Sequence, residues 1–102
     1  MERKALQLCQ VLFDVGEIVI TPAATAALEA SGQTLSEVLA RHSSGDWGEV
    51  SAAVRLVNER GLTEYFNLQS CYSIGENQHL VIVTNGERTV TTIHCQPAPA
   101  CP

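Results

Sequence analysis

Basic side chains are scarce in this sequence of 102 residues, which has six lysines and arginines against eleven acidic residues and a formal net charge of −5. Domains that bind nucleic acid present clustered basic side chains to the phosphates. The six basic residues are scattered instead along the chain: Arg3, Lys4, Arg41, Arg55, Arg60 and Arg88. Direct nucleic-acid binding is therefore not expected, and a dimeric nucleic-acid-associated regulator stays only as a second alternative.

Long apolar runs are missing too. A membrane-spanning helix needs about 20 apolar residues, and the strongly apolar runs here are only a few residues long. The charged start of the chain is not followed by a long apolar stretch, because Asp14 and Glu17 interrupt it. A cleavable signal peptide is not expected, and we predict a cytoplasmic protein with no membrane partner.

Recognisable catalytic and metal-binding motifs are absent from the sequence. It has no G-x-S-x-G or H-E-x-x-H pattern and no glycine-rich phosphate loop. Structural zinc sites take ligands in close pairs such as C-x-x-C, whereas the nearest pairs here are His94–Cys95 and Cys95–Cys101. We predict no catalytic residue, no metal site and no cofactor, and the balance is against an enzyme.

Four cysteines are present, and their even number is compatible with two disulfides: Cys9, Cys71, Cys95 and Cys101. The expected lack of a signal peptide favours reduced thiols instead. Cys71 and Cys95 fall in predicted strands, where a thiol acts as a small buried hydrophobic group. We therefore expect reduced cysteines.

The composition is that of a globular chain, with 45% hydrophobic and 17% charged residues. The length suits one domain with one modest core, covering residues 1–102. Residues 1–8 are expected to be flexible. Residues 96–102 contain three prolines and are expected to trail off the fold.

The first half of the chain predicts a strand and three short helices. Residues 10–21 are rich in valine and isoleucine and indicate a strand, with a bulge or turn at Gly16. Thr21–Pro22 begins a helix that Gly32 ends, and Thr34 opens a second helix with a capping box. Ser51 caps a third helix, whose apolar stripe is Val50, Val54 and Val57 and whose stop is Gly61.

The second half predicts three strands, because the hydrophobic period changes to two after Gly61. Turns are expected at 75–78 and at the two-residue hairpin Asn85–Gly86, and strands joined by short turns are antiparallel. The predicted class is α+β: an N-terminal strand, three short helices, then a three-stranded antiparallel meander, with the helices packed on one face of the sheet. The first strand can join the meander as a fourth member.

His42, Asp46 and Trp47 form the candidate functional cluster of the sequence. An oriented imidazole–carboxylate pair of His42 and Asp46 suits general-base chemistry, and an exposed Trp47 suits a binding hot spot. The structural interpretation is favoured for each residue. His42 lies on the apolar stripe of its helix, Asp46 bonds local backbone or caps the next helix, and the indole fills the core.

The last strand, near residues 88–95, is a candidate for self-association. It is rich in threonine and carries no charge between Thr89 and Cys95 unless His94 is protonated. Sheet edges usually carry charges that prevent pairing with another chain. We therefore predict a homodimer through the last strand, alongside an unidentified protein partner.

Six short stretches of the sequence taken together form a recognisable combination: Val19 to Pro22, Ala26 to Ala30, Leu39 to His42, Gly45 to Gly48, Asn58 to Arg60 and Val81 to Thr92. In this combination the chain resembles a family of small, functionally uncharacterised bacterial proteins carried on plasmids and other mobile elements. The resemblance implies accessory cargo such as a gene-cassette product, and it carries no established activity.

These observations favour a small accessory protein that acts as a non-catalytic protein-interaction or self-associating module. The alternative is a small hydrolase or small-molecule-binding domain that uses His42 and Asp46.

Overall fold

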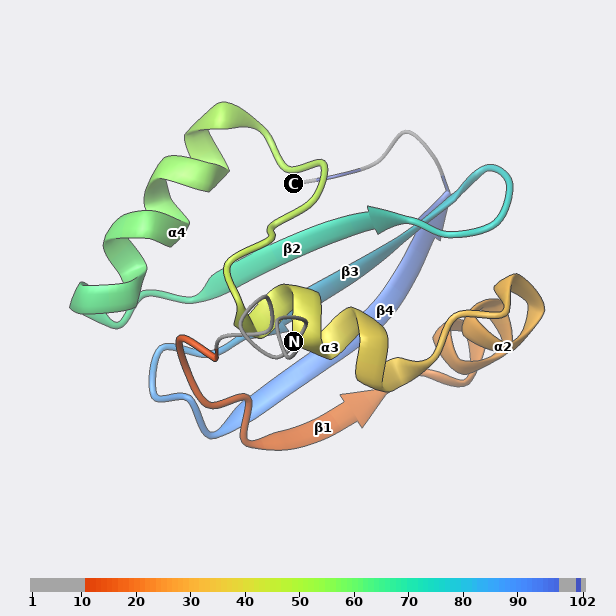
Figure 1. Cartoon of the computed structure of the whole chain (residues 1–102), viewed down its shortest axis with the longest axis horizontal. Coiled ribbons are helices and arrows are strands. Elements are labelled where there is room, and N and C mark those ends of the chain that lie inside the picture. The colour runs from red at the N-terminus through yellow and green to blue at the C-terminus, as the bar shows by residue number, and fades with distance from the viewer. Residues whose placement is uncertain (1–10, 98–100, 102) are drawn as a thin grey trace, which may run out of the picture.

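The computed structural model describes residues 11–97 and residue 101, and it confirms the α+β class (Figure 1). The predictions for residues 1–8 lie outside the described residues. Three helices and four strands follow the order β1, α2, α3, α4, β2, β3, β4. Their bounds are β1 Glu17–Ile20, α2 Pro22–Ser31, α3 Leu35–Ser43, α4 Ala52–Glu64, β2 Leu68–Ser73, β3 Gln78–Thr84 and β4 Val90–Pro97.

The four strands form one mixed sheet in the order β1-β4-β3-β2. β2, β3 and β4 pair antiparallel, as expected, and β1 joins β4 in parallel. The parallel pair is possible because the helices provide the long crossover that such a pair needs. Over Thr91–Ile93, β4 is paired on both sides, so the prediction of a free edge at the last strand is wrong there.

The segment before β1 was expected to be strand, but only Glu17–Ile20 pairs with the sheet. Gly16 has a φ of 67°, and a Cβ at this position would collide with the carbonyl of Thr89. Upstream, the Leu12 amide donates to the Ser43 carbonyl at 2.7 Å. Residues 11–16 therefore follow the end of α3 and do not extend the strand.

The helix starts agree with the sequence. Thr21 Oγ1 accepts from the Ala24 amide at 3.1 Å, Thr34 and Glu37 form the capping box, and Ser51 caps α4. The third helix continues past its expected stop to Glu64, and Tyr65 ends it with a φ of 60°. A Cβ at Gly61 would lie 3.0 Å from atoms of Leu68 and Phe66. The missing side chain at Gly61 therefore leaves room for Phe66 and Leu68, where the chain turns back toward β2.

Successive positions of β3 divide the core into two clusters. Leu80 and Ile82 pack with side chains of α2 and α3, whereas Val81 belongs to a second cluster against which Val54 and Leu62 of α4 pack. Neighbouring strand residues face opposite sides of a sheet, so the helices are not confined to one face as predicted. In Figure 1, α3 lies in front of the sheet, and α4 lies at the upper left, to the side of β2.

The connection between β3 and β4 is longer than the predicted two-residue hairpin. It spans residues 85–89, and the positive φ falls on Arg88 at 60°. The Asn85 side-chain oxygen accepts from the backbone amides of Thr89 and Val90 at 2.8 and 3.2 Å. An asparagine that bonds its own loop organises this turn, and the expected Asn85–Gly86 geometry is not used.

The end of the described chain is tied to the sheet. Residues 96 and 97 belong to β4, and Cys101 forms a disulfide with Cys71 of β2. The expectation of reduced thiols is therefore wrong for these two cysteines, and the expectation of a trailing segment is wrong for residues 96, 97 and 101; residues 98–100 and 102 lie outside the described residues. Cys95 is a free cysteine. Within the described residues, no helix is long and apolar enough to cross a membrane.

Candidate functional site

His42 lies at the C-terminal end of α3 and is fully buried. Its two ring nitrogens bond hydroxyls of the sheet: Nδ1 lies 2.6 Å from Ser70 Oγ and Nε2 lies 2.8 Å from Thr84 Oγ1. Thr84 in turn bonds Thr91 Oγ1 at 2.6 Å. The imidazole therefore belongs to a closed network of buried hydroxyls, which satisfies its polar atoms inside the core.

Burial, together with the nearby positive charge of Arg88, lowers the pKa of His42 to about 4. The ring is thus neutral at pH 7, with one nitrogen donating and the other accepting. Phe13 and Trp47 pack around it, with ring centroids 5.1 and 5.9 Å from the imidazole. These two aromatic rings, which also stack on each other, contribute to the burial of this histidine.

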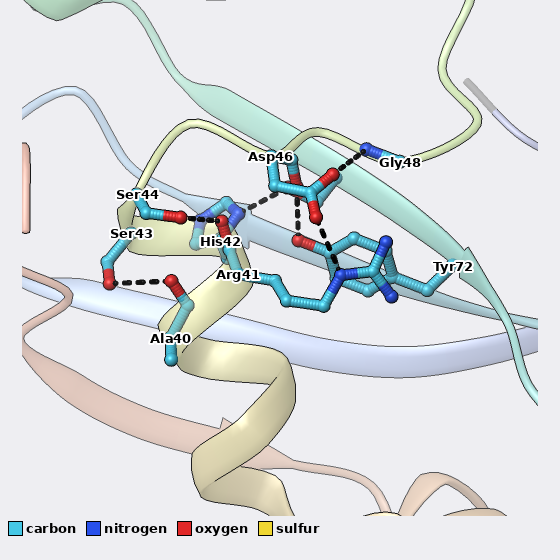
Figure 2. Close-up of polar contacts among 9 residues, drawn as sticks. Ala40, Arg41, His42, Ser43, Ser44, Asp46, Gly48 and Tyr72 are labelled. Atoms are coloured by element: carbon cyan, nitrogen blue, oxygen red, sulfur yellow. Dashed lines mark hydrogen bonds and ion pairs between the residues drawn. The ribbon is translucent and has the colours of Figure 1, made fainter. Parts of the chain in front are cut away.

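Asp46 does not pair with His42. Figure 2 shows its carboxylate turned to Arg41, whose Nε donates to Oδ2 at 2.8 Å. Its other oxygen accepts from the Gly48 amide at 3.3 Å, and this local backbone bond agrees with the structural interpretation. The imidazole–carboxylate pair considered from the sequence is not formed.

Arg41 also stacks on Tyr72, with its guanidinium carbon 4.2 Å from the ring centroid. The Tyr72 hydroxyl donates to the Asp46 carbonyl at 2.6 Å. The hydrogen bond to Asp46 raises the pKa of Arg41, and burial raises the pKa of Tyr72 to about 12. The tyrosine therefore stays protonated, and the group acts as a clamp on the turn after α3 (Figure 2).

Trp47 is fully buried and anchors the same turn. Its Nε1 donates to Glu59 Oε2 of α4 at 3.0 Å, and its ring stacks on Phe13 at 6.1 Å. Next to it, Gly48 forms a parallel bridge with Cys71. The hypothesis of an exposed Trp47 hot spot is wrong, because the indole joins α4, β2 and the segment before β1.

A polar cluster that the sequence did not indicate lies near the end of β2. His79 Nε2 lies 3.0 Å from Glu49 Oε1, and Ser73 Oγ donates to Glu49 Oε2 at 2.5 Å. The hydrogen bond from Ser73 lowers the pKa of Glu49, with a further contribution from His79. The Cys71–Cys101 disulfide lies close by. The register of β2 and β3 places Ser73 opposite His79, and no motif in the sequence marks this pairing.

Apolar side chains of α4 that were expected to face the core are exposed. Asn58 takes the buried position, where its amide exchanges two hydrogen bonds with the backbone of Gln69 at 2.8 and 3.0 Å. The predicted stripe residue Val57 is consequently 49% exposed, and Leu56 is 65% exposed. Tyr65 and Phe66 follow with 68% and 41% exposure. We use the name α4 face for the exposed apolar residues of α4 and of the chain directly after it: Leu56, Val57, Tyr65 and Phe66.

Arg88 supports the end of this face. Its guanidinium donates to the carbonyls of Gly61 at 2.7 Å and Phe66 at 2.8 Å, and it lies 5.5 Å from the Tyr65 ring centroid. Burial lowers the pKa of Arg88, although not enough to neutralise it near pH 7. Beside Tyr65 is an open surface hollow of about 550 Å³, lined by Tyr65, Asn85, Gly86 and Glu87.

No protein-family model, curated protein or solved structure matches this chain.

Proposed function

We propose that the protein is a non-catalytic interaction module that binds another protein chain, of different sequence or a second copy, through the α4 face. The observation that carries the proposal is the concentration of large apolar side chains there. Four of the seven large hydrophobic residues that are exposed in the described chain lie between Leu56 and Phe66. Single exposed apolar residues are ordinary, whereas a group of them is typical of contact surfaces.

The chemistry of the α4 face fits an interface. Tyrosine is enriched in binding hot spots, and the Arg88 guanidinium lies 5.5 Å from the ring centroid of the exposed Tyr65. Charged residues of both signs lie along the same helix, among them Arg60 and Glu64, which form an ion pair at 2.9 Å. Such a polar surround is typical of interfaces between soluble proteins.

The alternative, a hydrolase using His42 and Asp46, gains no support from the geometry. His42 is buried among aromatic rings and hydroxyls, and Asp46 faces Arg41 on the surface. A general base needs a route to its substrate and a hydrogen bond to the proton that it removes. The accessory role implied by the resemblance to mobile-element proteins is part of the same proposal, since such a role requires no active site.

The test compares the wild-type chain with Leu56→Glu. A carboxylate in the middle of an apolar contact is left unpaired when the contact forms, so binding weakens strongly. We expect wild-type protein either to form a dimer in light scattering or to retain a saturable partner from the host. Leu56→Glu is expected to lower that association at least tenfold.

Val11→Glu is the matched control, because Val11 is 64% exposed but lies far from α4 in the sequence. We expect it to associate like wild type. A wild-type chain that stays monomeric and retains no partner would contradict the proposal, and so would equal losses in the two variants.

A further inference from the structure

Three potential metal ligands lie close together near the C-terminal end of β2. Cys71, His79 and Cys101 each offer one ligand atom, and these three atoms lie within 4.8 Å of one another. Cys71 and His79 are buried, and Cys101 is partly buried. They come from β2, from β3 and from the segment after β4. We call them the Cys71–His79–Cys101 cluster.

One atom of this cluster has no partner. His79 is only 7% exposed, yet its Nδ1 makes no hydrogen bond within the described part of the chain. An unsatisfied polar atom in the interior costs free energy and requires an explanation. The other ring nitrogen indicates what this atom can do, because Nε2 lies 3.0 Å from Glu49 Oε1. A carboxylate there holds the proton on Nε2 and leaves a lone pair on Nδ1.

A carboxylate bonded to the far nitrogen of a histidine is the arrangement that orients metal-binding imidazoles. Glu49 is itself held by Ser73 Oγ at 2.5 Å, so the carboxylate has a fixed position. His79 thus combines a buried Nδ1 that has no partner in the described residues with a ring nitrogen within 4.8 Å of both sulfur atoms. Sulfur and imidazole nitrogen are the ligands that zinc prefers in proteins.

We propose that, once the disulfide is reduced, Cys71, His79 and Cys101 bind one Zn²⁺ ion. The disulfide and the metal site exclude each other, because the same two sulfurs form either a bond to one another or two bonds to the metal. Cys101 can therefore be linked to β2 in two alternative ways: by the disulfide when the thiols are oxidised, or through the metal ion when they are reduced. This proposal is independent of the α4 face.

The chemistry balances with a dithiol as the reductant. The dithiol gives two electrons and two protons to the Cys71–Cys101 disulfide and becomes a cyclic disulfide itself, which leaves two thiols on the protein. Zinc then replaces the two thiol protons, which leave to solvent, and it accepts the lone pair of His79 Nδ1. Three protein ligands leave the fourth tetrahedral position to water.

The required movement is small. With zinc–ligand bonds near 2.0 to 2.3 Å, ligand atoms of a tetrahedral site lie about 3.5 to 3.8 Å apart. One ring nitrogen of His79 and the two sulfur atoms already lie within 4.8 Å of one another, so each separation has to change by only a few ångströms to reach that spacing. Cys95 does not compete, since it packs against the other core cluster, with α2 and α3.

The experiment uses the full chain with Cys9→Ser and Cys95→Ser, so that only Cys71 and Cys101 can supply thiolates. Co²⁺ is added as a coloured substitute for zinc, before and after anaerobic reduction with a phosphine that is then removed. We expect the reduced protein to bind one ion with a thiolate-to-cobalt charge-transfer band and visible bands of tetrahedral Co²⁺. Adding Zn²⁺ should bleach both, and the oxidised protein should show neither.

Variants separate this site from chance binding to two thiols. His79→Ala is expected to weaken Zn²⁺ binding at least tenfold in competition with a chromogenic chelator. Glu49→Gln keeps all three ligands and is expected to weaken it about 10- to 100-fold through the orientation of His79. His94→Ala is the matched control, because the His94 ring bonds Gln96 and lies outside the cluster, and it should bind like the parent.

The cluster includes core residues, so each variant is first checked for a cooperative thermal transition. If His79→Ala does not fold, the Zn²⁺ affinity of Glu49→Gln and the Co²⁺ spectrum of the parent protein test the proposal. Unchanged affinity in both His79→Ala and Glu49→Gln would overturn the proposal. A cobalt spectrum without the thiolate band, or equal binding by the oxidised chain, would overturn it as well.

Discussion

His42 is a titratable side chain that the core holds in its neutral form. Both ring nitrogens bond hydroxyl groups, Ser70 on one side and Thr84 on the other, and a neutral imidazole satisfies both as donor and acceptor. Protonation turns the accepting nitrogen into a second donor and buries a charge near Arg88. The same contacts that stabilise neutral His42 therefore oppose its charged form.

At this scale we predict a loss of stability on mild acidification. The pKa of His42 is about 4 in the folded chain and near 6.5 in the unfolded chain. The unfolded state takes up a proton first, so the free energy of unfolding falls as the pH drops from about 6.5 to 4, by about 3 kcal/mol in total. Denaturant unfolding across this range measures the effect, and above pH 7 this contribution is constant.

His42→Gln is the control for that prediction, since glutamine does not titrate. The variant should be less stable at pH 7 and should lack the part of the pH dependence that belongs to residue 42. Identical pH profiles for the two proteins would show that His42 has the same pKa in the folded and the unfolded chain, which contradicts the prediction.

Single residues divided clearly into those that the sequence explains and those that it does not. The local role of Trp47 follows from a lone tryptophan in a tight turn, and burial confirms the core interpretation. The partners of His42 did not follow, because Ser70 and Thr84 lie 28 and 42 residues away. His79 was likewise missed as a partner of Glu49, because a spacing rule finds only ligands that are close in sequence.

Among the elements, the helix caps were predictable because a cap is a contact between near neighbours. Thr21, Thr34 and Ser51 each bond an amide three residues on. The orientation of α4 was not predictable from its valines. Asn58 takes the inner side by bonding the backbone of Gln69 on β2, and those two hydrogen bonds outweigh the burial of Val57.

The start of β1 gives a prediction at this scale, through a pair of glycines with similar backbone angles. Gly16 and Gly32 have φ values of 67° and 79°. A Cβ at Gly32 meets nothing within 4 Å in the described part of the chain, whereas one at Gly16 collides with the backbone of Thr89. Gly32→Ala should cost about 1 kcal/mol, the ordinary cost of the left-handed conformation.

Gly16→Ala should cost clearly more, about 3 kcal/mol, because the strand end must also move away from the β3–β4 connection. Thermal or denaturant unfolding of the two variants measures the difference. Equal losses would mean that the close approach of residues 16 and 89 is not present in solution.

For the whole molecule, the α+β class was predictable from the order of strand-like and helix-like segments. The mixed sheet was not, because parallel pairing of β1 with β4 leaves no mark in either strand's own alternation. The disulfide was missed for a similar reason: it joins residues 30 apart, one of them in a proline-rich segment with no predicted structure. Long-range pairings of this kind are decided by packing of the complete chain.

At the same scale, the candidate residues His42 and Trp47 lie in the core, while apolar side chains of the α4 face are exposed. His42 and Trp47 are fully buried, whereas Leu56 and Tyr65 are more than half exposed. This distribution is what the proposal of a non-catalytic interaction module rests on. The α4 face is thus the part of the surface on which the proposed function depends.

Site-specific photo-crosslinking in the producing cell tests this claim most directly, with a benzophenone amino acid placed at position 56 in one variant and at position 11 in another. The two native side chains are equally exposed, at 65% and 64%. We predict a discrete cross-linked species from position 56, either a dimer or one defined heterocomplex, and none from position 11. No adduct at position 56, or the same adducts from both positions, would contradict the account.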